Sequence, residues 1–163
     1  MSAPVTLLDD VVALAATRGA LLGLDLGTKT IGVAASDALR MTATGLETLK
    51  RRKFTLDAEA IEAHVARRGV VGIVLGLPRN MDGSEGPRAQ STRAFARNLA
   101  ARGTGPIAFW DERLSTVAVE RALIEADSSR KRRAEVIDKL AAAYILQGAL
   151  DRLAAAARVG GAG

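Results

Sequence analysis

Three acidic side chains, far apart in the chain, stand where carboxylates could do chemistry. Asp25 lies near the end of an expected strand, where alternation places Gly23 and Gly27 on the same face and leaves space above the carboxylate. Glu112 follows the apolar run Ile107–Trp110 after one intervening residue, Asp111, which places it at the end of another expected strand. Space beside a carboxylate at a strand end suits a metal ion or a phosphate.

Asp138 belongs to an expected helix and is followed at helical spacing by Ala141, Ala142 and Ile145. Its carboxylate is therefore directed along an apolar face. Burying an isolated charge is costly, so this group must be paired, protonated or bound to a cation.

Carboxylate and water ligands suit hard cations such as Mg²⁺ or Mn²⁺. Two such ions about 4 Å apart can activate a water molecule and stabilise the leaving oxygen of a phosphodiester. This chemistry requires neither cysteine nor histidine. The sequence has no cysteine and one histidine, which excludes thiol nucleophiles, cysteine zinc sites and clusters of several histidines.

Each acid also has a purely structural interpretation. Asp25 could initiate a turn, Glu112 could form a surface ion pair with Arg113, and Asp138 could pair with Arg133 or Lys139. The net charge of +5 is compatible with a polyanionic partner. An aromatic content of 3% argues against a stacking platform for single strands.

The elements that must position these acids follow from the hydrophobic pattern. A length of 163 residues predicts one domain, over 21–156, with an N-terminal extension over 1–20 and a flexible tail over 157–163. We expect strands over 21–26, 30–36, 42–49, 70–75 and 106–110, and helices over 56–68, 87–102, 114–126 and 134–156. The extension could add a short helix over 5–18, and the basic segment 128–133 separates the last two helices.

This order predicts an α/β fold. Three strands with short connections form an antiparallel portion, and the strand–helix alternation that follows gives parallel crossovers. The result is a mixed five-stranded sheet with helices on both faces, which is the order of the ribonuclease H-like fold. No apolar stretch approaches the ~18 residues of a membrane span, and the first residues lack a secretory pattern. Together with the absence of cysteine, this favours the cytoplasm.

Four segments of the sequence resemble the YqgF family of pre-16S rRNA nucleases and Holliday-junction-resolvase-like (RuvX) proteins. They are LLGLDLGTKTIGVAASD (Leu21–Asp37), GLPRNMDGSEGPRAQ (Gly76–Gln90), WDERLST (Trp110–Thr116) and SSRKRRAEVIDKLAAAYILQ (Ser128–Gln147). They keep the family's order and spacing, and the resemblance covers about Leu21–Leu153.

The resemblance implies a ribonuclease H-like fold and places the family's acidic triad on Asp25, Glu112 and Asp138. It also implies a role in maturing the 5′ end of 16S rRNA in the cytoplasm. The carboxylate chemistry described above predicts that the triad holds two Mg²⁺ or Mn²⁺ ions. Arg79 stands where the family is expected to have an apolar residue, and it adds a positive charge to a loop expected to face substrate. The expected contacts to nucleic acid are Lys29, Arg79, Arg113, Arg130, Lys131, Arg132 and Arg133.

The sequence leaves the substrate open. Structured RNA, such as precursor rRNA, is the leading candidate, and a Holliday junction in DNA is the alternative because no motif reports a contact to a 2′-hydroxyl. A non-catalytic nucleic-acid-binding or ribosome-assembly protein would have the same fold and charge. The chain is expected to be a monomer or a homodimer. The hairpin DLGTKTIGVA (Asp25–Ala34) also resembles the phosphate-binding hairpin of sugar kinases and chaperone ATPases, but the second domain and second phosphate loop of those proteins are missing.

Overall fold

The computed structural model describes residues 6–114 and 130–161. In chain order the elements are β1 (Leu7–Leu8), the 3-10 helix η1 (Val11–Ala16), β2 (Leu21–Leu26), β3 (Thr30–Ser36), β4 (Ala43–Lys50), α1 (Phe54–Arg68), β5 (Gly72–Leu77), α2 (Pro87–Ala100), β6 (Ile107–Asp111), the 3-10 helix η2 (Glu112–Leu114) and α4 (Arg130–Gly161). The helix expected over 114–126 lies outside the described residues, except for Leu114.

The strands form one mixed sheet in the order β1-β6-β5-β2-β3-β4. The hairpins β2–β3 and β3–β4 are antiparallel, and the pairs β2–β5, β5–β6 and β1–β6 are parallel. The expected count of five strands was wrong by one. Leu7 and Leu8, which periodicity assigned to a short helix, instead extend the sheet by pairing with Ile107 and Ala108.

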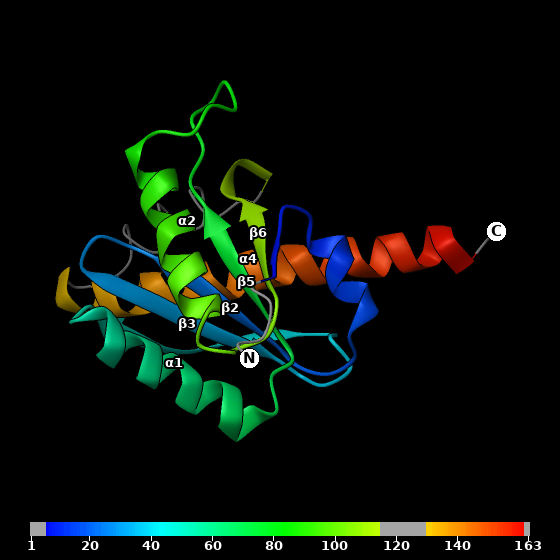
Figure 1. Cartoon of the computed structure of the whole chain (residues 1–163), viewed down its shortest axis with the longest axis horizontal. Coiled ribbons are helices and arrows are strands. Elements are labelled where there is room, and N and C mark those ends of the chain that lie inside the picture. The colour runs from blue at the N-terminus through cyan, green and yellow to red at the C-terminus, as the bar shows by residue number, and fades with distance from the viewer. Residues whose placement is uncertain (1–5, 115–129, 162–163) are drawn as a thin grey trace.

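Helices cover both faces of this sheet, as expected (Figure 1). Strand alternation sends Leu22, Leu24 and Leu26 to the face covered by α1 and α2. Leu21 faces the opposite side, where α4 runs across β2, β3 and β4. Asp25 shares the parity of Leu21, so the sheet directs it towards α4.

Helix α4 differs at both ends from the expected span. Arg130–Arg133 form its first turn, whereas the density of charge had suggested a loop between two helices. At the other end the helix continues past Ala156 to Gly161 and projects beyond the sheet (Figure 1). Within residues 6–114 and 130–161, no helix is both long and apolar enough to cross a bilayer.

The segment before β2 is held tightly to the rest of the fold. Val11 and Leu14 are buried in the apolar cluster beneath α4. Arg40 donates from its guanidinium to the main-chain oxygens of Gly19 and Leu14 and to Oγ1 of Thr17, at 2.7 to 3.0 Å. Arg40 has a φ of 59°, an uncommon backbone conformation for a residue with a Cβ. These contacts make the residues after β1 part of the core.

Replacing the buried Leu14 tests this conclusion. We expect Leu14→Ala to lower the free energy of unfolding by about 2–4 kcal/mol, because it leaves a cavity beneath α4. Urea unfolding followed by circular dichroism measures the change. The exposed Leu39 provides the control, since Leu39→Ala should stay within about 0.5 kcal/mol of the parent. Equal losses in the two variants would contradict a packed N-terminal segment.

Candidate active site

Asp25 lies on the α4 face of β2 and is 8% exposed. Gly23, two residues earlier on the same face, has the backbone of α4 directly above it. A Cβ atom at Gly23 would lie 2.7 Å from Cβ of Leu146 and 3.0 Å from the main-chain oxygen of Ala142. Asp25 therefore points into the narrow space between the sheet and the N-terminal half of α4.

The lateral neighbours of Asp25 are also glycines. Gly32 pairs directly with Asp25 across the β2–β3 hairpin. On the other side, β2 and β5 pair in parallel up to Leu24 and Leu75, so the next residue along β5 is Gly76. The carboxylate thus stands in a patch of sheet with no flanking side chains, which leaves room for groups from outside the sheet.

Asp138 occupies the space above Gly32. A Cβ atom at Gly32 would overlap the main-chain carbonyl oxygen of Asp138, so α4 can approach this closely only over a glycine. The Asp138 carboxylate accepts a hydrogen bond from the hydroxyl of Thr30, with an Oγ1 to Oδ2 distance of 2.6 Å. Sequence reasoning did not single out Thr30, although it lies in the same motif as Asp25.

Glu112 occupies the space above Gly76. A Cβ atom at Gly76 would lie 2.8 Å from Oε1 of Glu112 and 2.6 Å from Cδ1 of Ile145 on α4. Glu112 begins η2, immediately after β6, so the chain turns back over the end of the neighbouring strand β5. Gly76 therefore leaves space for the Glu112 side chain, just as Gly32 leaves space for Asp138.

The fold brings the three predicted acids to one face and one end of the sheet. Carboxylate oxygens beside a glycine cradle are suitable ligands for Mg²⁺ or Mn²⁺. In the arrangement that the described residues adopt, however, no three acidic, histidine or cysteine side chains are close enough together to hold a metal ion.

Arg113, which was expected to contact nucleic acid, instead binds other groups of the protein. Its guanidinium binds both oxygens of Asp111, with a shortest distance of 2.6 Å, and Nη1 donates to the main-chain oxygen of Met81 at 3.3 Å. The side-chain hydrogen bond from Arg113 holds the pKa of the Asp111 carboxyl below its ordinary value. Lys29, by contrast, is exposed in the turn between β2 and β3, near the acids.

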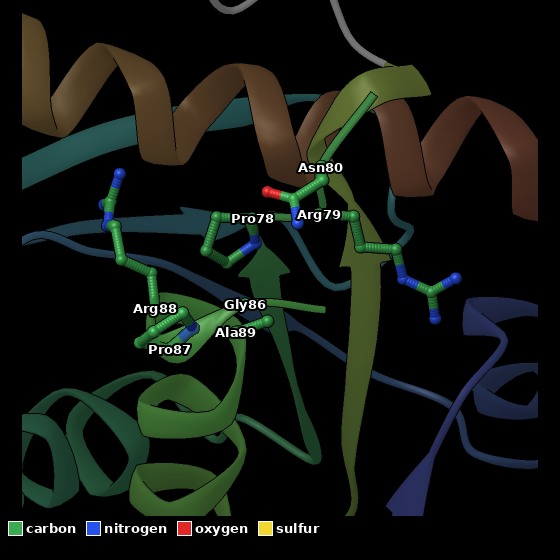
Figure 2. A pocket seen from close by; sticks show the side chains of 7 residues that line it. All are labelled: Pro78, Arg79, Asn80, Gly86, Pro87, Arg88 and Ala89. Carbon is green, nitrogen blue, oxygen red and sulfur yellow. The ribbon is translucent and has the colours of Figure 1, made fainter. Parts of the chain in front are cut away.

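Arg79 does not line the acidic face. It borders a pocket of about 210 Å³ between the end of β5 and the first turn of α2, which Asn80 and Arg88 also line. Figure 2 shows the Arg79 guanidinium extending away from the other lining side chains. It lies 3.6 Å from Glu85, which binds Arg93 at 2.6 Å. Asn80 and Arg88 were not among the predicted contacts.

The side chains of the basic segment lie outside the described part of the structure. Contacts from Arg130, Lys131, Arg132 and Arg133 to nucleic acid therefore stay predictions. His64, the single histidine of the chain, is buried on the α1 side of the sheet, and its Nε2 lies 2.8 Å from Oε2 of Glu47. That contact is on the other side of the sheet from the acids.

Comparison with known proteins then decides the family. The profile of the RuvX family, described as Holliday junction resolvase, matches residues 19–152. The chain belongs to the RuvX family. It is 70% identical over 146 residues to a protein of Cereibacter sphaeroides named "Putative pre-16S rRNA nuclease", covering 90% of this chain and 91% of that protein. A protein of Paracoccus denitrificans with the same name is 72% identical over 135 residues, covering 83% of this chain and 85% of the relative.

A solved structure supports the fold of this RuvX-family chain. It is described as Thermus thermophilus RuvC in complex with Holliday junction substrate, and it matches with a TM-score of 0.52 at 14% identity, over 84% of this chain and 97% of that one. At this identity the likeness concerns the fold alone, and it confirms the expected ribonuclease H-like class.

The glycine beneath Asp138 provides a test of this geometry. We expect Gly32→Ala to destabilise the RuvX-family chain by about 1–3 kcal/mol, because the added methyl group would force α4 off the sheet. Urea unfolding gives the value. Gly160→Ala is the matched control, since a Cβ atom there would meet nothing within 4 Å. If Gly32→Ala proved as neutral as the control, the close approach of α4 would be wrong.

The Asp111–Arg113 pair predicts a pH dependence. The pKa of Asp111 lies below its ordinary value of 3.8, so its contribution to stability is complete above that value and is lost as the pH falls through the folded-state pKa. Titration of the carboxyl carbon by NMR should show the lowered pKa in the parent and a return towards 3.8 in Arg113→Gln. An unchanged pKa in Arg113→Gln would show that the guanidinium is not its cause.

Proposed function

We propose that this chain is a divalent-metal-dependent endonuclease that hydrolyses phosphodiester bonds in structured RNA, and that it acts in the cytoplasm in the 5′-end maturation of pre-16S rRNA. The observation that carries the proposal is the convergence of Asp25, Glu112 and Asp138 from β2, η2 and α4 on one glycine-lined face. The net charge of +5 and the names of the relatives support a polyanionic rRNA substrate.

Each acid has a defined part in this proposal. Asp25, Glu112 and Asp138 would hold two Mg²⁺ or Mn²⁺ ions, which when bound supply an activated water and stabilise charge on the leaving oxygen. Asp25 is fixed by the sheet on both sides and forms the rigid member of the set. Asp138 and Glu112 reach the same face from outside the sheet, one from the helix α4 and the other from the short 3-10 helix η2.

Thr30 acts as a positioning residue. Its hydroxyl donates to Oδ2 of Asp138 and so limits the rotation of that carboxylate above the hairpin. A carboxylate with an orienting hydrogen bond keeps its ligand geometry better than one free to rotate. Thr30 has the same part whether the polynucleotide is RNA or DNA.

A second candidate substrate is branched DNA. The description of the matching family as Holliday junction resolvase favours it. Junction resolution calls for two symmetric cuts and therefore for a dimer, whereas end trimming needs one cut from one chain. Sedimentation of the chain together with mapping of its products on an RNA precursor and on a four-way junction separates these candidates.

Removal of the acids tests the mechanism. We expect Asp25→Asn, Glu112→Gln and Asp138→Asn each to slow cleavage of a pre-16S rRNA 5′ fragment about a hundredfold or more, since each change removes a ligand charge that stabilises the transition state by several kcal/mol. Chelation by EDTA should abolish cleavage by the parent, and Mg²⁺ or Mn²⁺ should restore it. Gel analysis of end-labelled RNA gives the rates.

Asp151→Asn is the matched control, because it makes the same charge change at an exposed position of the same helix. It should cleave at the parental rate. Parental rates in Asp25→Asn and Asp138→Asn would refute the mechanism. RNA binding that persists in EDTA, with no cleavage under either metal, would favour a non-catalytic binding protein.

A further inference from the structure

A tight β-turn between β5 and α2 displays Met81 to solvent. The main-chain nitrogen of Gly83 donates to the oxygen of Asn80 at 2.9 Å, which places Met81 at the first corner of the turn. The polar groups around it bond to one another. Asn80 donates to Ser84 through both its main chain and its side chain, and Ser84 donates to Oδ1 of Asp82. Met81 is 90% exposed on this closed turn.

Arg113 fixes this turn against the segment that carries Glu112. Its Nη1 donates to the main-chain oxygen of Met81, and a Cβ atom at Gly83 would lie 3.4 Å from the same nitrogen. The next residue, Leu114, is 68% exposed. Met81 in the loop and Leu114 in η2 are thus two large, exposed apolar residues on segments that Arg113 joins, and Leu114 lies two residues after the proposed metal ligand Glu112. We call Met81 and Leu114 the rim pair.

Among the described residues near the rim pair, two arginines already contact acidic side chains. The Arg113 guanidinium is bound to Asp111, and Arg79 lies against Glu85. These two arginines are therefore poorly placed to grip a phosphate as they stand. The rim pair instead presents apolar side chains to solvent. The apolar surfaces of a polynucleotide are the faces of its bases. Exposed apolar side chains beside a nucleic-acid site commonly insert next to bases and unstack them.

We propose that the rim pair contacts a nucleobase next to the scissile phosphate and holds it out of the base stack. This inference rests on the proposed function only for the presence of a polynucleotide on the acidic face. An unstacked base would bend the backbone at the acids and so select a boundary between single-stranded and paired segments over a continuous helix. The same contact would serve an RNA boundary or a DNA junction, because both present bases that are easily unstacked.

Base unstacking can be measured without cleavage. The first probe is a stem–loop RNA with a single-stranded 5′ extension. It carries 2-aminopurine at successive positions around the boundary between the stem and the extension. The second probe is a four-way DNA junction with 2-aminopurine at its centre. The protein carries Asp138→Asn so that the probe stays intact. We expect binding to raise 2-aminopurine fluorescence at one position, and Met81→Ala or Leu114→Ala to remove most of the rise and weaken binding about tenfold. Met81→Leu should retain the signal.

The chain supplies matched controls. Met41 and Leu39 are 71% and 82% exposed in the loop between β3 and β4, so Met41→Ala and Leu39→Ala remove the same side chains from another surface. Both should leave the fluorescence and the affinity at the parental level. A full rise with Met81→Ala and Leu114→Ala would overturn the proposal, and so would an equal loss in the Met41 and Leu39 variants.

The two proposals fail differently. If the rim pair governs fluorescence but the parent cleaves nothing with Mg²⁺ or Mn²⁺, the base contact stands and the nuclease does not. If the parent cleaves and the rim-pair variants change neither fluorescence nor affinity, the nuclease stands and the base contact does not. The probe that shows the fluorescence rise, either the RNA stem–loop or the DNA junction, also identifies the substrate that presents the base.

Discussion

The close approach of α4 to the sheet is the constraint on which the acidic site depends. Over Gly32 the helix backbone lies where a Cβ atom would stand in any other residue, and over Gly23 a Cβ atom would lie 2.7 Å from Cβ of Leu146. Packing at this distance lets Asp138 sit directly above the strand that pairs with Asp25. Glu112 completes the arrangement over Gly76. The three acids therefore share one face of the sheet because glycines, which contribute no side chain, leave space for them there.

Much of this arrangement could be predicted from residue type and spacing. Alternation along β2 gave the face of Asp25, and the end of an apolar run gave the position of Glu112. The apolar spacing after Asp138 predicted a helix face turned towards the sheet, as Ala142 and Ile145 show. These features are local, because each depends on the period of one element and on the burial of its apolar side.

Other features could not be predicted because they depend on contacts between distant segments. Leu7 and Leu8 are too short a run to indicate a strand, and their place follows only from the open edge of β6. The positions of Gly32 and Gly76 beside Asp25 required the strand register. The contacts of Arg113 and Arg79 depend on which carboxylates lie nearby in the fold. The sequence therefore did not reveal that Arg113 binds Asp111, or that Arg79 lies 3.6 Å from Glu85.

The order of the elements along the chain also determines when the site can exist. Asp25 is translated early and Glu112 later, but Asp138 belongs to α4, the last element of the fold. Since a growing polypeptide leaves the ribosome from its N-terminus, the sheet can assemble while α4 is still to emerge. Until that helix docks over Gly32, the third acid is absent from the face. A nascent chain therefore lacks the complete set of carboxylates until α4 has emerged and docked, and its proposed activity would begin only then.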